Sequence, residues 1–405
     1  RSTPKPSSAA SDVYKRQDVN LSGQKILVRV DFNVPFSPGT LEIANTKRIS
    51  ASIPTLQYLL DNDAAIVICS HLGRPKGREV AGLSLRPIWD KLNQMLGLES
   101  AFCPSLDFSE ISAASQKVNP GEVLLLENLR FHPGEETNDL KFAQNLANLA
   151  DIYVNDAFGA AHRHHASVQG VTNYIPSVAG LLLEKEILSL QSVLTMPKRP
   201  FTAVLGGAKV SDKINVVRNL MTVADNILIG GGMAATFLAA ESVFVGDSQV
   251  EEAFIDSANQ LMKESRALDC EIVLPNDAVV SKCFGPDSSN RICDVSDIKD
   301  GEMLLDIGPS TSLLFKDVLS ATASALWNGP MGVYEWPQYS KGTRAVAESL
   351  SRENITSVIG GGSTVDAVSS LGLEARMEHV STGGGASLEF LEGRDLPGIT
   401  SLIDI

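Results

Sequence analysis

Positively charged side chains follow several apolar segments in the first half of the chain. One arginine lies in the element after the first segment, and the others come soon after the second, third and fourth. They are Arg48, His71, Arg74, Arg130, His162, Arg163 and His165. Because the whole chain has a net charge of −14, these groups do not belong to a generally basic surface. Clustered cationic side chains bind carboxylates and phosphates, so the pattern predicts a site for a multiply charged anion.

A second candidate site lies in the stretch FTAVLGGAKVSDKIN. Phe201–Leu205 is an apolar run typical of a strand, and Gly206 and Gly207 end it. We expect a helix to begin near Lys209, which would place Lys209 and Lys213 on one helix face. A strand, a glycine turn and a helix N-terminus with two cations form a phosphate cradle. Taken alone, the stretch also fits an ordinary turn with two solvated lysines.

Glycine clusters end four apolar runs in the second half of the chain, at residues 203–207, 227–232, 357–362 and 379–385. Bare backbone at strand ends suits a flat base and a phosphate chain, so the repeated pattern indicates a nucleotide site. Glu335 is a candidate for hydrogen bonding a ribose, with a solvated carboxylate as the alternative. The sequence lacks G-x-x-x-x-G-K-[ST], which excludes a P-loop protein, and G-x-G-x-x-G after either first strand, which weakens a dinucleotide-binding interpretation.

The anion site requires a scaffold that gathers the ends of several strands. Strands are expected at residues 25–30, 64–69, 122–126 and 152–154, and helices between them at 46–60, 85–96 and 140–150. Strands that are apolar throughout are buried on both faces, which predicts a parallel sheet covered by helices. Ligands bind such sheets at the C-terminal strand ends, where the cations lie.

A helix at residues 184–194 and a Pro-rich break at 196–200 separate this half from a second one of the same kind. The predicted fold class is therefore α/β, with two doubly wound parallel-sheet domains joined by a helix and hinge. One half offers an anion site and the other a nucleotide site. Phosphoryl transfer fits this pair best, because its catalysis is mostly positioning and charge neutralisation.

Composition and charge exclude several other classes. The chain has 405 residues, of which 43% are hydrophobic and 20% charged, and no apolar run is long enough to span a bilayer. Its acidity argues against nucleic-acid or anionic-membrane partners. Five cysteines without a CxxC pair argue against a disulfide framework and structural zinc. His162, His164 and His165 have Arg163 among them and no HExxH pattern, which disfavours a metal site.

Residues 1–17 are set apart from the fold prediction. Their segment SSAASDVYKRQ resembles a translated sequencing adapter, and a Ser-rich transit peptide is the alternative. The native N-terminus is therefore not readable, and we expect a cytoplasmic or plastid stromal protein. The sequence shows no heptad pattern, so we expect a monomer.

Eight motifs together resemble the phosphoglycerate kinase family, in the family's order over residues 18–405. They are VRVDFNVP, SHLGRP, LENLRF, VNDAFG, LGGAKVSDK, IGGGM, LWNGPMGVYEW and STGGGASLEFLEG. The resemblance implies a phosphotransferase with a carboxyl group as acceptor. The reaction would pass a phosphoryl group reversibly between 1,3-bisphosphoglycerate and ADP, giving 3-phosphoglycerate and ATP, with Mg²⁺ carried by the nucleotide.

The resemblance also implies the domain order and the hinge. It implies two Rossmann-like domains, with a 3-phosphoglycerate-binding domain at 18–185, an interdomain helix and linker at 186–200, a nucleotide-binding domain at 201–395, and a segment at 396–405 that returns to the first domain. Because the two ligands would bind in different domains, we expect hinge closure.

Matching motifs assign roles to individual residues. The glycerate substrate would be held by Asp31, Asn33, Arg48, His71, Arg74, Arg130, His162 and Arg163. The nucleotide would be held by Gly206, Gly207, Lys209, Lys213, Gly230, Gly231, Gly232, Asn328, Glu335, Gly361, Gly362, Ser363 and Thr364. Arg48, Lys209 and Lys213 would be catalytic and act on the transferred phosphoryl group.

One position departs from the family pattern. The family has Gly-Gly-Gly-Asp-(Thr/Ser) where this chain reads Gly360-Gly361-Gly362-Ser363-Thr364. Ser363 is expected to serve as the helix N-cap, but it is a weaker ligand than a carboxylate for a hard cation. Asp366 stands three residues later as a possible Mg²⁺ ligand. We expect an active enzyme with altered Mg²⁺ dependence. The alternatives are a catalytically weakened or silent paralogue that binds nucleotide, favoured only by Ser363, and an NAD-dependent dehydrogenase.

Overall fold

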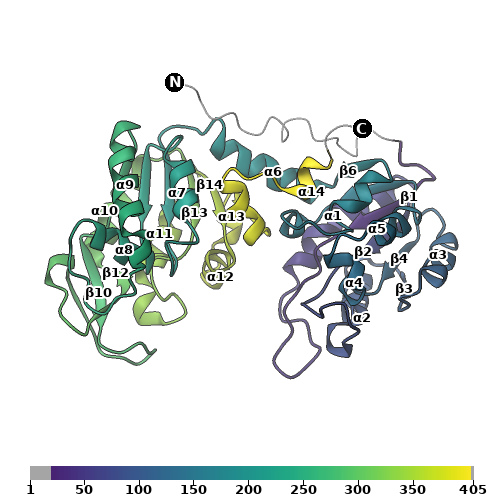
Figure 1. Ribbon diagram of the computed structural model, residues 1–405, viewed down its shortest axis with the longest axis horizontal. Coiled ribbons are helices and arrows are strands. Elements are labelled where there is room, and N and C mark those ends of the chain that lie inside the picture. The colour runs from purple at the N-terminus through teal and green to yellow at the C-terminus, as the bar shows by residue number, and fades with distance from the viewer. Residues whose placement is uncertain (1–19, 403–405) are drawn as a thin grey trace. The chain divides into compact units, whose positions relative to one another are not determined.

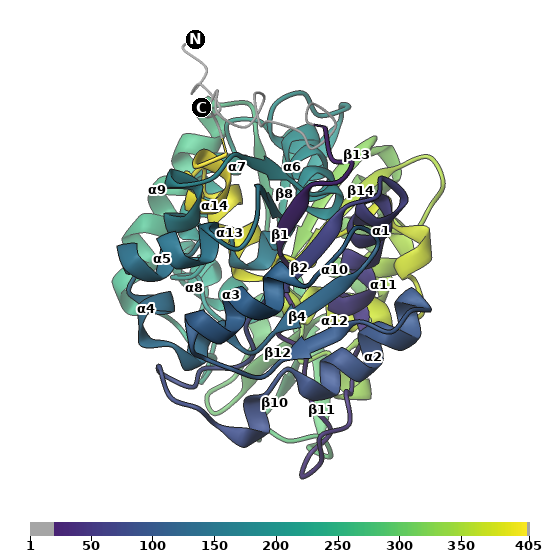
Figure 2. The ribbon, with the colours of Figure 1, turned by 90° about the vertical axis from the view of Figure 1, so that its right-hand side faces the viewer.

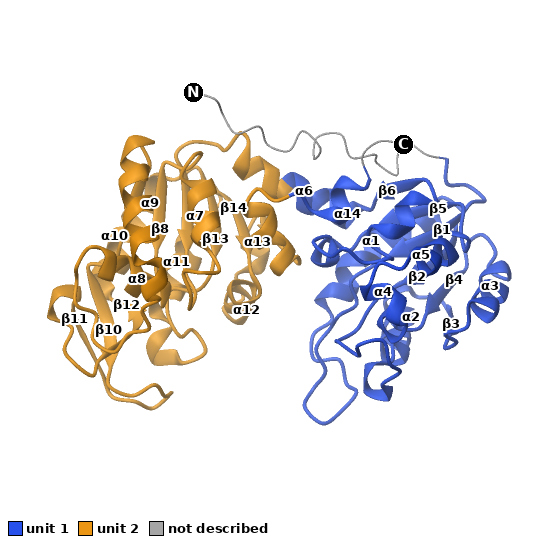
Figure 3. Cartoon of the chain, viewed as in Figure 1, with its two compact units in different colours: residues 1–188, 395–405 blue, residues 189–394 orange. Residues whose placement is uncertain are grey.

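The computed structural model describes residues 20–402 and shows two compact units (Figures 1 and 3). The predicted adapter segment at 1–17 lies outside the described residues. The described part of unit 1 covers residues 20–188 and 395–402, and unit 2 covers 189–394. The boundary between the units falls inside helix α6 (Leu181–Leu194). None of the helices within residues 20–402 has the length and apolar character needed to cross a membrane.

Unit 1 is built on a six-stranded parallel sheet in the order β3-β4-β2-β1-β5-β6. Figure 2 shows α1 and α2 on one side of its central strands and α3 and α5 on the other. The strands are β1 (Lys25–Arg29), β2 (Ala65–Cys69), β3 (Ala101–Cys103), β4 (Val123–Leu126), β5 (Ile152–Asn155) and β6 (Ser177–Ala179). The helices are α1 (Lys47–Asp61), α2 (Arg86–Leu96), α3 (Phe108–Gln116), α4 (Pro133–Glu136), α5 (Leu140–Ala147) and α14 (Pro397–Thr400).

The apolar strand runs explain why this sheet forms. β2 and β4 are buried along their whole length, and apolar side chains from β1, β2 and α1 share one core cluster. The register places Arg29, the last residue of β1, beside Cys69 of β2 and Asn155 of β5. The segments that follow these strands therefore leave the sheet at one edge, as the sequence predicts.

The last described residues pack in unit 1. Asn155 Nδ2 donates to the carbonyl oxygen of Gly398 over 2.9 Å, and the Gly398 amide donates to the carbonyl oxygen of Ala161 over 2.8 Å. A Cβ at Gly398 would lie 2.7 Å from a methyl carbon of Val168, so the close approach requires glycine.

Unit 2 repeats the architecture, with the parallel order β15-β14-β13-β7-β8-β9. Its strands are β7 (Phe201–Leu205), β8 (Asn226–Ile229), β9 (Glu271–Val273), β13 (Ser324–Asn328), β14 (Thr356–Gly360) and β15 (His379–Val380). Its helices are α7 (Ile214–Leu220), α8 (Met233–Ala240), α9 (Ile255–Ala267), α10 (Pro309–Ala321), α11 (Lys341–Leu350), α12 (Gly362–Ser370) and α13 (Gly385–Leu391). The predicted fold class of two parallel α/β sheets is confirmed.

A small antiparallel sheet in unit 2 was not predicted. It has the order β11-β10-β12 and consists of β10 (Asp277–Ser281), β11 (Asn290–Asp294) and β12 (Met303–Ile307). The β11 side chains alternate between exposed and half-buried positions, so this strand lacks the continuous apolar run that marks the parallel strands.

Candidate functional site

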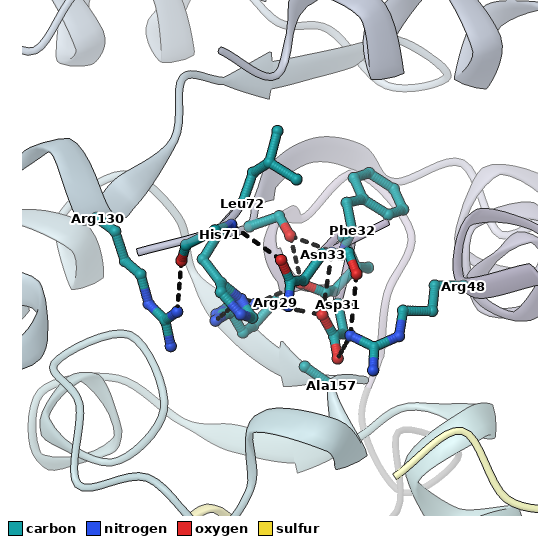
Figure 4. Close-up of polar contacts among 12 residues, drawn as sticks. Arg29, Asp31, Phe32, Asn33, Arg48, His71, Leu72, Arg130 and Ala157 are labelled. Carbon is teal, nitrogen blue, oxygen red and sulfur yellow. Dashed lines mark hydrogen bonds and ion pairs between the residues drawn. The ribbon is translucent and has the colours of Figure 1, made fainter. Parts of the chain in front are cut away.

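The first half-site gathers side chains from the loops after β1 and β2 and from α1 (Figure 4). Arg48 Nη1 donates to Asp31 Oδ2 over 2.8 Å and to the carbonyl oxygen of Asn33 over 3.2 Å. Asp31 Oδ1 also accepts from the Asn33 amide, and Asn33 Oδ1 accepts from the Gly73 amide over 2.9 Å. These bonds join the two loops, and they hold the Arg48 guanidinium by its Nη1 nitrogen.

His71 lies buried among positive charges. Its Nδ1 is 3.0 Å from Arg29 Nη2 and 4.0 Å from Asp31 Oδ1. Burial lowers the pKa of His71 well below its usual value, and Arg29, Arg130 and Arg48 lower it further. The imidazole is therefore neutral at pH 7, so the positive charge of the site comes from arginines.

Arg130 and His165 extend this positive region. Arg130, carried by a short 3₁₀ turn after β4, donates from Nη1 to the carbonyl oxygen of Gly73 over 2.7 Å. Burial and then the nearby Arg29 lower its pKa, against the pull of Glu136. Burial, followed by Arg130, Arg29 and Arg163, lowers the pKa of His165 to about 3. Several arginines held close together despite mutual repulsion leave a region that an anionic ligand would neutralise.

The structure brings most of the predicted anion-site residues into one region. Asp31, Asn33, Arg48, His71 and Arg130 are joined through direct contacts or through the Gly73 backbone. His162 and Arg163 lie close enough to His165 to lower its pKa. The side chain of Arg74 is exposed, and it is not drawn into these contacts among residues 20–402.

Sequence reasoning missed Arg29. This arginine is fully buried at the end of β1, and it touches both His71 and Ser167. The sequence did carry a signal, because KILVR places a charge inside an otherwise apolar strand. A buried charge is costly unless it is paired or functional.

The second half-site lies at the topological switch point of the unit 2 sheet. From β7 the chain proceeds outward through β8 and β9, whereas β13, β14 and β15 extend the other way. Such a reversal opens a crevice at the C-terminal strand ends. Lys213 Nζ lies there and donates to the carbonyl oxygens of Gly206 (2.5 Å) and Asn328 (3.1 Å), at the ends of β7 and β13. Burial lowers the pKa of Lys213 to about 8, although Asp212 acts in the opposite direction.

The predicted helix start at Lys209 is wrong. Helix α7 begins at Ile214, so Lys209 and Lys213 do not share a helix face. Ser211 explains the difference, because its amide and hydroxyl both donate to the carboxylate of Glu251, over 2.9 and 2.6 Å. This contact across 40 residues holds the segment before α7 as a turn. Lys209 is exposed in that turn.

Glycines at these strand ends pack against one another. A Cβ at Gly231 would lie 2.5 Å from the Gly207 nitrogen, and one at Gly206 would lie 2.2 Å from the Pro330 oxygen. A Cβ at Gly329 would lie 2.4 Å from Lys213 Nζ. Gly230 and Gly232 are similarly crowded, by Met331 and Ala208. The predicted strand-end placement of the glycines is confirmed. Because they lack a side chain, neighbouring turns can pack against one another and Lys213 can approach Gly329 closely.

Gly231→Ala is expected to destabilise unit 2 by about 2–4 kcal/mol, because a methyl group would collide with backbone atoms of Gly207 and Pro330 in a left-handed conformation. Gly372→Ala is the matched control: φ is +65° at Gly231 and +68° at Gly372, but nothing lies within 4 Å of the added Cβ at Gly372. We expect the control to cost only about 1 kcal/mol. Urea unfolding of the two purified variants compares them, and equal midpoints would refute the packing account.

Asn328 and Thr364 complete this half-site from β13 and α12. Thr364 Oγ1 accepts a hydrogen bond from the Gly329 amide over 2.6 Å, so it holds the strand-end turn. Asn328 is 2% exposed, and its Nδ2 has no hydrogen-bond partner within the described chain. A Cβ at Gly361 would lie 3.2 Å from that Nδ2. Because an unpaired buried donor is costly, the amide is suited to an anionic ligand.

The expectation that Ser363 caps α12 is wrong. Helix α12 begins at Gly362, and its N-cap is Gly361 with φ of +86°, a conformation that glycine adopts easily. Gly362, Ser363 and Asp366 are exposed on the first turns of the helix. Ser363 therefore stands inside the first turn, beside free backbone amides.

The carboxylates near α12 allow a test of whether the site suits a metal ion. Burial raises the pKa of Tyr334, and the nearby charges of Glu335 and Asp366 raise it further, so both carboxylates lie near that phenol. Residues 20–402 contain no group of three or more His, Cys, Asp or Glu side chains that could enclose a metal ion. This donor set fits Mg²⁺ that is held mainly by phosphates and by one or two carboxylates.

Comparison with known proteins identifies the family. The family model described as phosphoglycerate kinase matches residues 16–394. Phosphoglycerate kinase of Moorella thermoacetica is 47% identical over 388 residues, which cover 96% of this chain and 98% of the relative. That of Pseudothermotoga lettingae is 49% identical over 389 residues, with the same coverage. The solved structure of phosphoglycerate kinase from Coxiella burnetii superposes with a TM-score of 0.88 at 36% identity and covers 96% of this chain and 98% of its own. The resemblance seen in the motifs is thus confirmed: the chain belongs to the phosphoglycerate kinase family.

Proposed function

We propose that the two half-sites carry out the reaction of the family in the following way. The reaction is a reversible phosphoryl transfer between 1,3-bisphosphoglycerate and ADP, which gives 3-phosphoglycerate and ATP. We assign the roles from one observation, which is that the two units carry different kinds of side chains at their strand ends. Unit 1 holds buried arginines around neutral histidines, whereas unit 2 holds a lysine and glycine turns at a sheet switch point.

The arginine region of unit 1 binds the glycerate substrate. Both 3-phosphoglycerate and 1,3-bisphosphoglycerate are multiply charged, and planar guanidinium groups pair with carboxylates and phosphates through two hydrogen bonds. Asp31 and Asn33 orient Arg48 from one side and leave its other N–H groups for the ligand. Asp31, Asn33, His71, Arg74, Arg130, His162 and Arg163 complete the proposed set.

The strand ends of unit 2 bind ATP or ADP. Lys213 and the unpaired Asn328 amide meet the phosphates, with Lys209 available from its exposed turn. Gly361 and Gly362 offer free amides at the start of α12. Glu335 would accept a hydrogen bond from the ribose. Gly206, Gly207, Gly230, Gly231 and Gly232 shape the turns near the base, and Ser363 and Thr364 flank the phosphates.

No protein base is required. In the direction that consumes ATP, the attacking group is the carboxylate of 3-phosphoglycerate, which is ionised at neutral pH. Mg²⁺ bound to the nucleotide phosphates would neutralise charge on the transferred group. Catalysis by the chain then consists of placing the two ligands and stabilising the transferred phosphoryl group with Arg48, Lys209 and Lys213. The hinge motion that would bring the ligands together remains a prediction.

Ligand binding tests this division of roles. Isothermal titration calorimetry should show that Arg130→Ala weakens 3-phosphoglycerate binding about tenfold or more, the loss of one charge-assisted hydrogen bond, and leaves ADP binding unchanged. Asn328→Ala should weaken ADP binding and leave 3-phosphoglycerate binding unchanged. A variant that loses the ligand assigned to the other unit would contradict the proposal.

Ser363→Asp is expected to lower the Mg²⁺ concentration that gives half-maximal rate, by about threefold to tenfold. The added carboxylate stands on the first turn of α12, where it is a better ligand than a hydroxyl for a hard cation. Mg²⁺ titrations at saturating ATP measure this shift. Ser370→Asp, at the far end of the same helix, is the control. The account of Ser363 fails if the Mg²⁺ requirement and the KM for ATP stay as they are.

A further inference from the structure

Three buried polar residues outside the proposed binding set form a hydrogen-bonded chain that ends at His71. Ser167 Oγ donates to Glu135 Oε1 over 2.6 Å, and Arg29 Nε donates to Ser167 Oγ over 2.9 Å. Arg29 Nη2 then lies 3.0 Å from His71 Nδ1. Glu135 and Arg29 are fully buried, and Ser167 is 1% exposed. Two charges buried at such a cost indicate a role beyond packing.

Ser167 is fixed at each of its polar atoms. Its amide donates to Glu135 Oε2 over 2.9 Å, and its carbonyl oxygen accepts from the Tyr153 hydroxyl over 2.7 Å. Its hydroxyl donates to Glu135, so only the oxygen lone pairs remain for Arg29. The serine therefore presents an acceptor to Arg29 in one defined direction.

The direction of the hydrogen bond is also fixed at the His71 end of this hydrogen-bonded chain. A guanidinium group can only donate hydrogen bonds. Because Arg29 Nη2 donates to His71 Nδ1, that nitrogen must present its lone pair, and the ring proton must sit on Nε2. A cationic imidazole has N–H groups on both nitrogens and would lose this bond.

We propose that Glu135, Ser167 and Arg29 are positioning residues that hold His71 as a neutral imidazole with its proton on Nε2. The charged groups that face His71 agree with this role, because Arg29, Arg130 and Arg48 all disfavour the imidazolium. Asp31 opposes them, but its Oδ1 is 4.0 Å from Nδ1, beyond hydrogen-bond distance. Glu135 balances the charge of Arg29 through Ser167 and is three hydrogen bonds away from the His71 ring.

The inference deepens the proposed function and rests on it in one respect. If His71 contacts the glycerate substrate, Nε2–H is the donor that it offers to a carboxylate or hydroxyl oxygen. A fixed tautomer keeps that donor available across the physiological pH range. Substrate affinity then depends on residues that never touch the substrate.

Nitrogen-15 NMR of the ligand-free protein tests the tautomer without any turnover. The His71→Gln variant identifies the His71 signals. In the unaltered chain, Nδ1 should be unprotonated and Nε2 protonated from pH 5.5 to 8. In Ser167→Ala, we expect signals of the Nδ1–H or imidazolium form, a KM for 3-phosphoglycerate raised about tenfold at pH 7, and a new pH dependence near 6.5.

Ser115→Ala is the matched control, because Ser115 is also a buried serine of unit 1 and its hydroxyl donates to the carbonyl oxygen of Leu149. Glu135→Gln tests the same chain if Ser167→Ala does not fold. An Nδ1–H or cationic His71 in the unaltered protein would overturn the proposal, as would unchanged His71 signals in folded Ser167→Ala or Glu135→Gln, or the same change in Ser115→Ala. Loss of turnover with the tautomer intact would instead count against the proposed function.

Discussion

Arg48→Ala is expected to lower kcat about 10³-fold, the largest effect of any single substitution in unit 1. Asp31 and Asn33 hold this guanidinium by Nη1 alone, so its remaining N–H groups are available to a transferred phosphoryl group. The Arg48 side chain is 31% exposed, which lets it reach a ligand. Its removal leaves negative charge that develops in the transition state without a partner. Steady-state rates in the direction that consumes ATP measure the loss.

Two further variants separate geometry from charge at this position. Arg48→Lys keeps the charge but loses the planar pair of donors, so it should recover only part of the rate. Arg86→Ala removes an exposed arginine of the same unit that contacts the Trp89 and Phe102 rings, and it should leave kcat unchanged. A kcat of Arg48→Ala within threefold of the unaltered value would show that Arg48 is not catalytic.

Lys213→Ala is expected to lower kcat by about 10² to 10³-fold, because it removes the buried ammonium at the switch point of unit 2. Its Nζ bonds the carbonyl oxygens of Gly206 and Asn328, which fix the charge where β7 and β13 end. Lys316→Ala is the control, because Lys316 is an exposed lysine on α10, and this substitution should leave kcat unchanged. A comparable loss in both variants would contradict a specific role for Lys213.

The pH profile offers an independent test of the same lysine. With a pKa of about 8, Lys213 is cationic below that pH and neutral above it. If the cation is needed, kcat/KM for ATP should fall as pH rises through about 8, since kcat/KM reports groups of the free enzyme. A profile that stays level up to pH 9.5 would mean that the cation is not required.

The strand ends were predictable because the parallel strands are apolar throughout. Their runs, such as Ala65–Cys69 and Phe201–Leu205, are buried on both faces, and the candidate site residues follow directly after them. Adjacent parallel strands finish at one edge, so the order of residues along the chain sufficed to group His71 with Arg130 and Gly206 with Gly230. The family resemblance added Asp31 and Asn328 to these groups. The short edge strand Ala101–Cys103 was not predicted.

Features that depend on contacts distant in the sequence were not predictable. The start of α7 is set by the bonds from Ser211 to Glu251, and neither residue signals the other. The charge of Arg29 stands out in its apolar run, but nothing in the sequence indicates its partner Ser167, which lies 138 residues away. The N-cap of α12 is Gly361 and not Ser363, because the N-cap position has a positive φ, which glycine adopts more easily than serine.

Family membership bears on both alternatives raised by the sequence. Family membership replaces the dehydrogenase interpretation, and no observation beyond Ser363 favours a silent paralogue. The glycines, both lysines and the buried arginines of the two half-sites are all present. We therefore expect Ser363 to affect the Mg²⁺ dependence of the reaction and not to abolish activity.

The most direct test of the account is a coupled assay on the purified protein. The chain receives 3-phosphoglycerate, ATP and Mg²⁺, and a dehydrogenase that consumes NADH reports the formation of 1,3-bisphosphoglycerate. We predict NADH consumption that depends on all three components and that Arg48→Ala and Lys213→Ala nearly abolish. A folded protein that binds both ligands but consumes no NADH would contradict the account.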